Sequence, residues 1–207
     1  MKYIYKEKKK GAPVFVLLHG TGGTETDLVS LAEVLQPDYN ILGIRGNVQE
    51  NGMNRYFKRY GEGQYDWNDL KFRGNELYEF IVEKSRTYDF KLENTVLVGF
   101  SNGSNIAIQM MLQHPKTFQK AALFAPLYPA DIPEKQDFSH VEVFLSLGKG
   151  DPIVPETESE RVIHLFKQRG ADVTTTWVNG HNLTQEVALE AKNWLNYIVA
   201  KGGIDSK

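Results

Sequence analysis

The sequence contains no cysteine, which excludes disulfides, thiolate catalysis and cysteine-based zinc sites. It also lacks any run of about eighteen uncharged apolar residues, the length that a membrane-spanning helix needs. Residues 1–7 already carry charged side chains, which is not the pattern of a secretory signal. We therefore expect a cytoplasmic protein that does not insert into a membrane.

Charge of one sign is not in excess either. The 24 Lys and Arg residues balance 26 Asp and Glu residues, and the formal net charge is -2. Such a chain creates no field that would attract nucleic acid or an anionic membrane. The Lys8 to Lys10 run is followed by Gly11 and Pro13, which is typical of a solvated turn between two strands. We expect no nucleic-acid partner. A homodimer is compatible with the sequence, which holds no pattern that decides it.

The chain does have enough apolar material for one sizeable core, since 41% of its 207 residues are hydrophobic. It contains no internal repeat, low-complexity tract or linker-like segment. The sequence therefore predicts one domain over residues 1–207.

Apolar segments of two kinds alternate along this domain. Continuous β-branched runs, such as Val14 to Leu18, predict strands buried on both faces, whereas apolar residues at helical spacing predict helices. The predicted strands are 14–18, 39–44, 95–100, 121–124, 141–147 and 172–178, and the predicted helices are 28–35, 74–88, 102–113, 156–169 and 183–199. This alternation predicts an α/β fold: a mostly parallel sheet, helices on both faces and a ligand site at the carboxyl ends of the strands.

One long segment interrupts the alternation. Residues 45–71 are polar, contain glycine and aromatic residues, and show no clear period. We expect a long loop region there, and loops of this length in a compact domain are usually functional. Because the segment follows a strand at the ligand-binding edge, we expect it to lie over the active site.

A G-x-S-x-G motif occupies the junction between a predicted strand and a predicted helix, at Gly99, Ser101 and Gly103. This context is typical of a nucleophile elbow, a sharp strand-to-helix turn that exposes a reactive serine. The motif needs its glycines because the turn brings neighbouring backbone too close for side chains. The alternative is that Ser101 only caps the helix. We favour Ser101 as a catalytic nucleophile.

A serine nucleophile needs a base, and the base needs an acid that orients it. His181 lies between the last predicted strand and the last predicted helix, at the same edge as Ser101. The other four histidines fit structural roles. Where this motif occurs, the acid comes between serine and histidine in the chain. Asp151 follows the strand that ends at residue 147 and is our candidate, with Asp131 as the competing acid.

Acyl transfer also needs two N–H donors for the oxyanion. One is the backbone N–H of Asn102, directly after the serine. The other is expected from the glycine-rich turn 20–23, with Thr21 preferred and Gly22 second. A phosphate loop fits poorly, because the turn lacks a Gly-Lys-Ser/Thr ending and Glu25 stands where a dinucleotide motif needs glycine. We expect no cofactor, and no metal, since no ligand spacing such as H-E-x-x-H occurs.

Together these motifs resemble the small, lidless α/β-hydrolases of the carboxylesterase/phospholipase family. The likeness is strongest to the bacterial MhqD-type branch, which is related to acyl-protein thioesterases. It is carried by residues 18–23, 99–103, 148–155 and 180–181 and extends over about residues 3–200. The resemblance implies the triad Ser101, Asp151 and His181 and the oxyanion donors Thr21 and Asn102.

The sequence departs from the thioesterase relatives at two places. They usually have glutamine after the serine, where this chain has Asn102, and Ile44-Arg45-Gly46 replaces their proline-rich loop. Only the backbone of Asn102 is needed for the chemistry. The resemblance therefore does not transfer the identity of the substrate.

Residues 45–71 offer candidate substrate contacts. An apolar wall is expected from Met53, Tyr56, Phe57, Tyr65 and Trp67, and cations for a carboxylate or phosphate from Arg45, Arg55 and Arg59. The alternative is that these aromatic residues only pack the segment onto the domain. Because the chain is too short for a large lid domain, we expect open access and small esters.

The sequence thus predicts a serine hydrolase that cleaves carboxylic esters or thioesters of small to medium substrates through an acyl-enzyme on Ser101. One alternative is hydrolysis of a C–C bond in aromatic ring-cleavage products, which would use the same three residues. The other is a catalytically silent binding module on the same fold. The complete triad and the intact glycine-rich turn argue against it.

Overall fold

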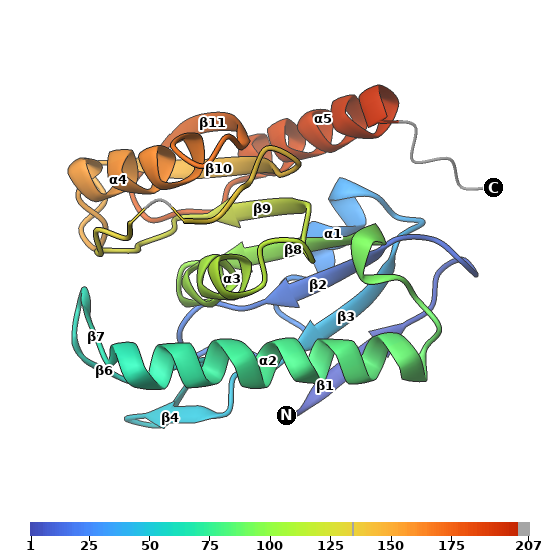
Figure 1. The fold of residues 1–207 in the computed structure, drawn as a ribbon, viewed down its shortest axis with the longest axis horizontal. Helices are drawn as coiled ribbons and strands as arrows, with labels where there is room; N and C mark the ends of the chain where they lie inside the picture. The colour runs from blue at the N-terminus through green and yellow to red at the C-terminus, as the bar shows by residue number, and fades with distance from the viewer. Residues whose placement is uncertain (134, 203–207) are drawn as a thin grey trace.

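The computed structural model describes residues 1–133 and 135–202, and a seven-stranded sheet forms its centre (Figure 1). In spatial order the strands are β1 (Tyr3–Lys6), β3 (Asn40–Ile44), β2 (Val14–Leu18), β8 (Thr95–Phe100), β9 (Lys120–Phe124), β10 (Glu142–Lys149) and β11 (Asp172–Asn179). Only β1 is antiparallel to its neighbour; the other pairs are parallel. The carboxyl ends of the parallel strands therefore meet at one edge.

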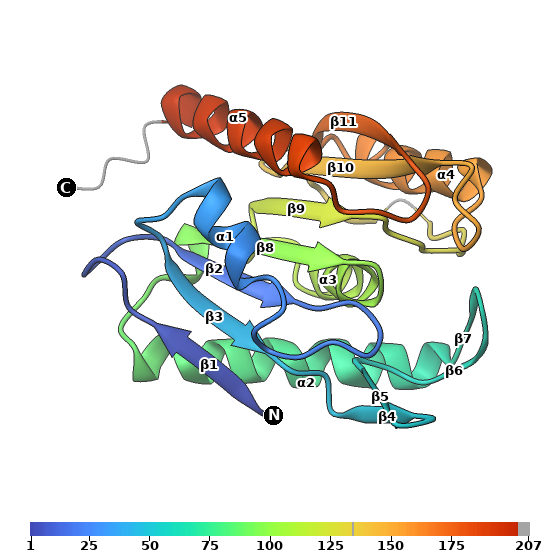
Figure 2. The same ribbon diagram turned by 180° about the vertical axis from the view of Figure 1, so that it is seen from behind.

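Helices cover both faces of the sheet. On one face lie α2 (Trp67–Thr87), α3 (Asn102–Gln113) and α4 (Glu156–Lys167), in front in Figure 1. On the other lie α1 (Val29–Leu35) and α5 (Gln185–Gly202), in front in Figure 2. Each face has its own apolar cluster, because side chains of the buried strands alternate between the two faces. A short 3₁₀ helix (Leu92–Asn94) leads into β8.

The predicted fold class is confirmed. Both β2 and β3 are buried along their whole length, as expected for strands covered on both faces. The strands predicted at 14–18 and 95–100 and the helix predicted at 102–113 have the bounds of β2, β8 and α3. Among the described residues, no separate cap domain covers the carboxyl edge of the sheet.

The prediction that residues 45–71 form a loop without regular structure is wrong. The segment contains two hairpins, β4 (Val48–Glu50) with β5 (Met53–Arg55) and β6 (Arg59–Gly61) with β7 (Gln64–Tyr65), and α2 begins at Trp67 rather than near residue 74. The strands are too short to show a period of two. One signal was present: Asn51-Gly52, both with positive φ (51° and 79°), is the sequence typical of a tight hairpin turn.

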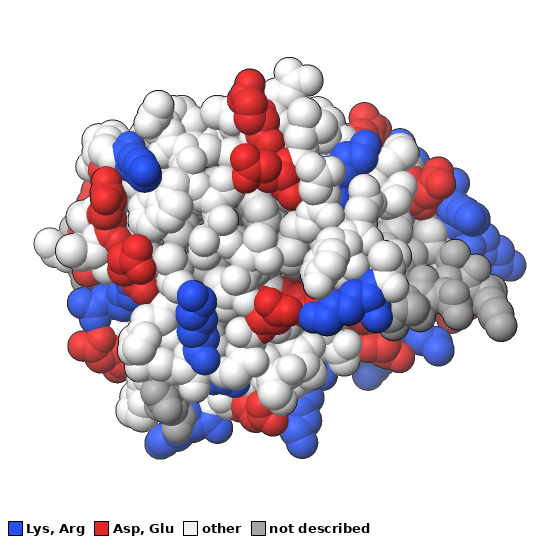
Figure 3. Space-filling model, turned by 90° about the horizontal axis from the view of Figure 1, so that it is seen from above, with Lys and Arg blue, Asp and Glu red and all other residues white. Residues whose placement is uncertain are grey.

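The surface agrees with the balanced composition. Figure 3 views the molecule from the side of α4 and α5, and there acidic and basic side chains are scattered among uncharged ones. In the part of the chain that the structure describes, no helix is sufficiently long and apolar to cross a membrane.

Candidate active site

Ser101 occupies the turn between β8 and α3, with φ 49° and ψ -114°. Its N–H donates to the carbonyl oxygen of Phe124 at 2.8 Å, which ties the turn to β9. A Cβ atom on Gly103 would overlap the carbonyl oxygen of Leu18, and one on Gly99 would lie 2.7 Å from the backbone nitrogen of Ser104. Neither position can hold a side chain, because neighbouring backbone lies too close, as the motif predicts.

The histidine and the acid predicted from the sequence lie next to this serine. The Nε2 atom of His181 is 2.9 Å from Oγ of Ser101, and its Nδ1 atom is 2.7 Å from Oδ2 of Asp151. Because a carboxylate only accepts, Nδ1 of the neutral imidazole carries the proton and Nε2 is free to accept the serine hydroxyl proton. This is the arrangement that activates a serine.

The Asp151 carboxylate is held by its own loop. Its side chain is fully buried, and Oδ1 accepts from the backbone N–H groups of Ile153 (2.8 Å) and Val154 (3.0 Å). The loop that carries His181 is attached to the end of β10, because the Gly180 N–H donates to the Lys149 carbonyl oxygen at 2.8 Å. The ends of β10 and β11 are therefore fastened together, and the carboxylate and imidazole keep their relative orientation.

Asp131, the competing acid, lies elsewhere. Its side chain is exposed and forms an ion pair with Arg161 on α4. The geometry thus favours Asp151 over Asp131 as the partner of the histidine.

Two backbone N–H groups beside Ser101 fit an oxyanion hole. Within residues 1–133 and 135–202, neither the Thr21 N–H nor the Asn102 N–H has a hydrogen-bond acceptor, and both residues line the cavity that contains Ser101. The Gly22 N–H instead donates to the Asn54 carbonyl oxygen at 2.9 Å. Gly22, the second choice from the sequence, is therefore occupied, and Thr21 is favoured.

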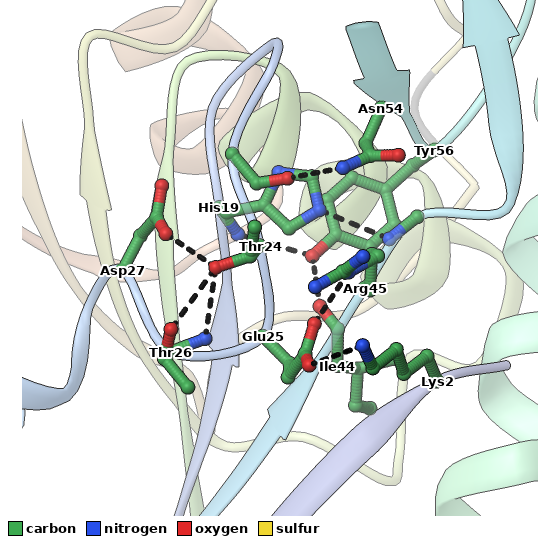
Figure 4. Close-up of polar contacts among 12 residues, drawn as sticks. Lys2, His19, Thr24, Glu25, Thr26, Asp27, Ile44, Arg45, Asn54 and Tyr56 are labelled. Atoms are coloured by element: carbon green, nitrogen blue, oxygen red, sulfur yellow. Dashed lines mark hydrogen bonds and ion pairs between the residues drawn. The ribbon is translucent and has the colours of Figure 1, made fainter.

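His19 supports the glycine-rich turn 20–23, which contains Thr21. Its ring is buried, Nε2 accepts from the Gly46 N–H at 3.0 Å, and Nδ1 lies 2.6 Å from the Gly20 carbonyl oxygen. Since Nε2 accepts, Nδ1 must carry the proton and donate to Gly20. Burial lowers the pKa of His19, which keeps the ring neutral. The His19 N–H also donates to the Tyr56 hydroxyl at 3.0 Å (Figure 4).

Arg45, predicted as a substrate contact, lies in this region beside Glu25 (Figure 4). It does not line the cavity. Its Nε atom donates to Oε2 of Glu25 at 2.5 Å, and Lys2 approaches the other oxygen of that carboxylate at 3.6 Å. Burial alone would raise the pKa of Glu25, but backbone and Arg45 hydrogen bonds outweigh it and lower the pKa. The prediction missed this pair because Glu25 is twenty residues away in the chain.

The cavity in front of Ser101 has a volume of about 310 Å³. It is lined by Thr21, Met53, Arg55, Arg59, Glu62, Tyr65, Phe100, Ser101, Asn102, Asn105, Leu127, Ile153, Val154 and His181. Of the predicted contacts, Met53 and Arg55 on β5 and Arg59 and Tyr65 on the second hairpin line this cavity. The apolar side chains from the β8 turn and from residues 127, 153 and 154 were not predicted, since they come from segments with other assigned roles.

Three predicted aromatic contacts pack the structure instead of lining this cavity. Tyr56 is buried, and its hydroxyl donates to the Ile44 carbonyl oxygen at 2.6 Å. Phe57 is fully buried, and Trp67 packs between Tyr65 and Tyr128. The alternative of packing is therefore the better description of these three side chains.

Two asparagines brace the cavity wall. The Asn102 side-chain oxygen accepts from the Tyr56 N–H at 2.8 Å, which fastens the end of β5 to the elbow. Asn105 donates to the Tyr65 hydroxyl and accepts from the Leu127 N–H, each at 2.8 Å. The Asn102 side chain therefore has a structural role, in addition to the role expected for its backbone N–H.

Comparison with known proteins agrees with this geometry. The family model described as phospholipase/carboxylesterase matches residues 1–199. The chain belongs to the phospholipase/carboxylesterase family. It is 42% identical to MhqD of Bacillus subtilis (strain 168), named as a hydrolase, over 195 residues that cover 94% of this chain and 97% of MhqD. As a member of this family the protein is a hydrolase of the carboxylesterase type.

Solved structures give the same result. The Bacillus cereus carboxylesterase is 40% identical with a TM-score of 0.92, and the match covers 95% of this chain and 94% of that one. The structure of YahD with malic acid is 32% identical with a TM-score of 0.90, and the match covers 95% of this chain and 98% of YahD. The α/β-hydrolase fold expected from the resemblance is therefore confirmed.

Proposed function

We propose that the protein hydrolyses small carboxylic esters or thioesters through an acyl-enzyme on Ser101. The observation that carries the proposal is the continuous chain from the serine hydroxyl through His181 to the buried Asp151 carboxylate, 2.9 Å and 2.7 Å long at its two contacts. Family membership supports ester hydrolysis in general, and this geometry supports the serine-dependent form of it.

In the first half of the reaction, Oγ of Ser101 attacks the carbonyl carbon and its proton passes to Nε2 of His181. The carbonyl oxygen becomes negative and accepts hydrogen bonds from the N–H groups of Thr21 and Asn102. The C–O or C–S bond then breaks, and the imidazolium gives its proton to the leaving alcohol or thiol. The acyl group remains as an ester on the serine.

In the second half, a water molecule attacks the acyl-enzyme. His181 takes a proton from the water and returns it to Oγ as the serine ester breaks. The products are the free carboxylic acid and regenerated Ser101. In both halves, Asp151 stabilises the imidazolium when it forms and fixes the tautomer of the neutral imidazole.

The size of the site supports small substrates. A cavity of about 310 Å³ is at the lower end of the range for ligand sites. Malic acid, the ligand in the YahD structure, is a four-carbon acid that a cavity of this volume can hold. A cytoplasmic location stays a prediction from the sequence.

The test combines a covalent probe with turnover. A fluorophosphonate should label the wild type, with the adduct on Ser101 by peptide mass spectrometry, and Ser101→Ala should lose both labelling and hydrolysis of p-nitrophenyl butyrate. Ser104→Ala, which removes a buried hydroxyl three residues away, is the matched control and should keep both. Retained turnover in Ser101→Ala would remove the proposal. A butyrate ester and a butyrate thioester, compared at equal concentration, separate the two substrate classes.

A further inference from the structure

Arg55 is a buried cation at the rim of the Ser101 cavity. Its side chain is 3% exposed, yet it lines the cavity. Its Nη1 atom donates to the hydroxyl of Thr21 at 2.6 Å, and its Nε atom donates to the carbonyl oxygen of Phe57 at 3.4 Å. Both acceptors are neutral oxygens. Within the described part of the chain, no oxygen accepts a hydrogen bond from Nη2.

The neighbouring carboxylates are bound to a different arginine. Nε of Arg59 donates to both oxygens of Glu50, at 3.0 and 3.1 Å, and Nη2 of Arg59 lies 3.0 Å from the same carboxylate. Nη1 of Arg59 pairs with Glu62 at 2.5 Å. The nearest carboxylate oxygen to Arg55 is Oε2 of Glu50 at 3.7 Å, beyond hydrogen-bond distance. Both carboxylates are therefore hydrogen-bonded to Arg59, and the ion pair of Arg55 with Glu50 includes no hydrogen bond.

A buried charge that lacks a hydrogen-bonded counter-ion is costly, and an anionic ligand would remove that cost. A guanidinium stays protonated at neutral pH, and its planar fork matches the two oxygens of a carboxylate. We infer that Arg55 forms an anion-binding subsite beside Ser101 and that the substrate is an ester or thioester carrying a carboxylate. The inference rests on the proposed function, because it names the substrate class of the same site.

The rest of the cavity fits such a substrate. The Thr21 hydroxyl accepts a hydrogen bond from Arg55, and the Thr21 N–H is one of the two proposed oxyanion donors. The carboxylate subsite therefore lies close to the reacting carbonyl. Met53, Leu127 and Ile153 supply apolar lining for the few carbons in between. A cavity of about 310 Å³ holds a short chain, as in a monoester of a short dicarboxylic acid.

The test compares pairs of esters in which a carboxylate replaces a terminal methyl group. Methanol release from monomethyl glutarate and from methyl valerate gives the ratio of kcat/KM for an anionic and a neutral acyl group of equal length. A second pair, 3-acetoxypropionate and propyl acetate, has the carboxylate on the alcohol side. For at least one pair we expect Arg55→Met to lower the anionic-to-neutral ratio by about 10- to 100-fold, mainly through KM of the anionic ester. Arg55→Lys should keep part of the ratio, since it retains the charge without the fork.

Arg161→Met, which removes an exposed arginine on α4, is the charge-matched control and should leave both ratios unchanged. If Arg55 only braces Thr21, the kcat/KM values of both members of each pair should fall together, and that result would overturn the inference. Unlabelled Ser101 with no ester turned over would instead contradict the proposed function itself.

A measurement on the wild type covers the case in which the Arg55 variants do not fold. Succinate should inhibit hydrolysis of methyl butyrate competitively, and succinamide, its uncharged analogue, should not. Equal inhibition by the two compounds, or none by succinate up to about 100 mM while the neutral ester is hydrolysed, would reject an anion subsite.

Discussion

The Nδ1–H group of His19 donates to the carbonyl oxygen of Gly20 at 2.6 Å. That oxygen belongs to the same planar peptide group as the N–H of Thr21, which points in the opposite direction. The hydrogen bond from His19 therefore orients the peptide that we assign to the oxyanion hole. His19 acts through this peptide and is a positioning residue for the proposed reaction.

Two substitutions of His19 separate this role from simple packing. Asn at position 19 has its donor at the level of Nδ1 and can still bond to Gly20, whereas Gln reaches the level of Nε2 and can bond only to Gly46. We expect His19→Gln to lose about 10- to 100-fold in kcat with little change in KM, and His19→Asn to lose much less. Steady-state kinetics measure this, with urea unfolding to compare their stabilities. Equal kcat losses in the two variants would contradict the role.

Stability should fall on mild acidification because of the same imidazole. Burial lowers the pKa of His19 in the folded protein below its ordinary value of 6.5, and it lowers the pKa of His114 in the same direction. As the pH falls below 6.5, the unfolded chain takes up these protons first. The free energy of unfolding therefore decreases, by at most about 1.4 kcal/mol per pH unit for each proton.

Urea unfolding at several values between pH 7.5 and pH 5 measures this slope. His19→Asn should have a smaller slope than the wild type, and His114→Asn isolates the second contribution. A wild-type stability that is constant or rises on acidification over this range would show that the His19 ring is not held neutral.

The acid of the proposed triad is tested by Asp151→Asn. An amide at this position can donate to Nδ1 of His181, which favours the tautomer with its proton on Nε2, where it can no longer accept from Ser101. We expect kcat to fall by about 10⁴-fold without loss of the fold. Asp131→Asn, the matched control, should have wild-type kcat because its carboxylate pairs with Arg161 at the surface. A larger loss in Asp131→Asn would exchange the two assignments.

The backbone at Ser101 is strained, with φ 49° and ψ -114°, a region that favours glycine. We expect Ser101→Gly to have a free energy of unfolding about 1–2 kcal/mol higher than Ser101→Ala, although both lack the hydroxyl. The same pair at Ser104, inside α3, should show the reverse order by about 1 kcal/mol, since alanine is favoured in a helix. Thermal or urea unfolding of the four variants gives both differences. If alanine were the more stable variant at both positions, the result would argue against strain at the elbow.

Much of this molecule was predictable because its information is local. Continuous apolar runs predicted β2 and β8, and the G-x-S-x-G motif at a strand-to-helix junction predicted the turn at Ser101. Parallel strands bring their carboxyl ends to one edge. Residues that directly follow β8, β10 and β11 were therefore expected to meet, and Ser101, Asp151 and His181 lie within hydrogen-bond distance.

The orientation of side chains in residues 45–71 was decided only by tertiary structure. Arg45 and Arg55 are indistinguishable as letters in a polar segment, yet Arg45 finds Glu25 whereas the hairpin register turns Arg55 and Met53 together toward the cavity. Such partners come from distant parts of the chain, and short strands carry no period that reveals which side faces inward. The fold and the residues for the proposed chemistry could thus be predicted from local sequence patterns. Which cation stands beside Ser101 depends on long-range pairing, and the proposed choice of substrate depends on that cation.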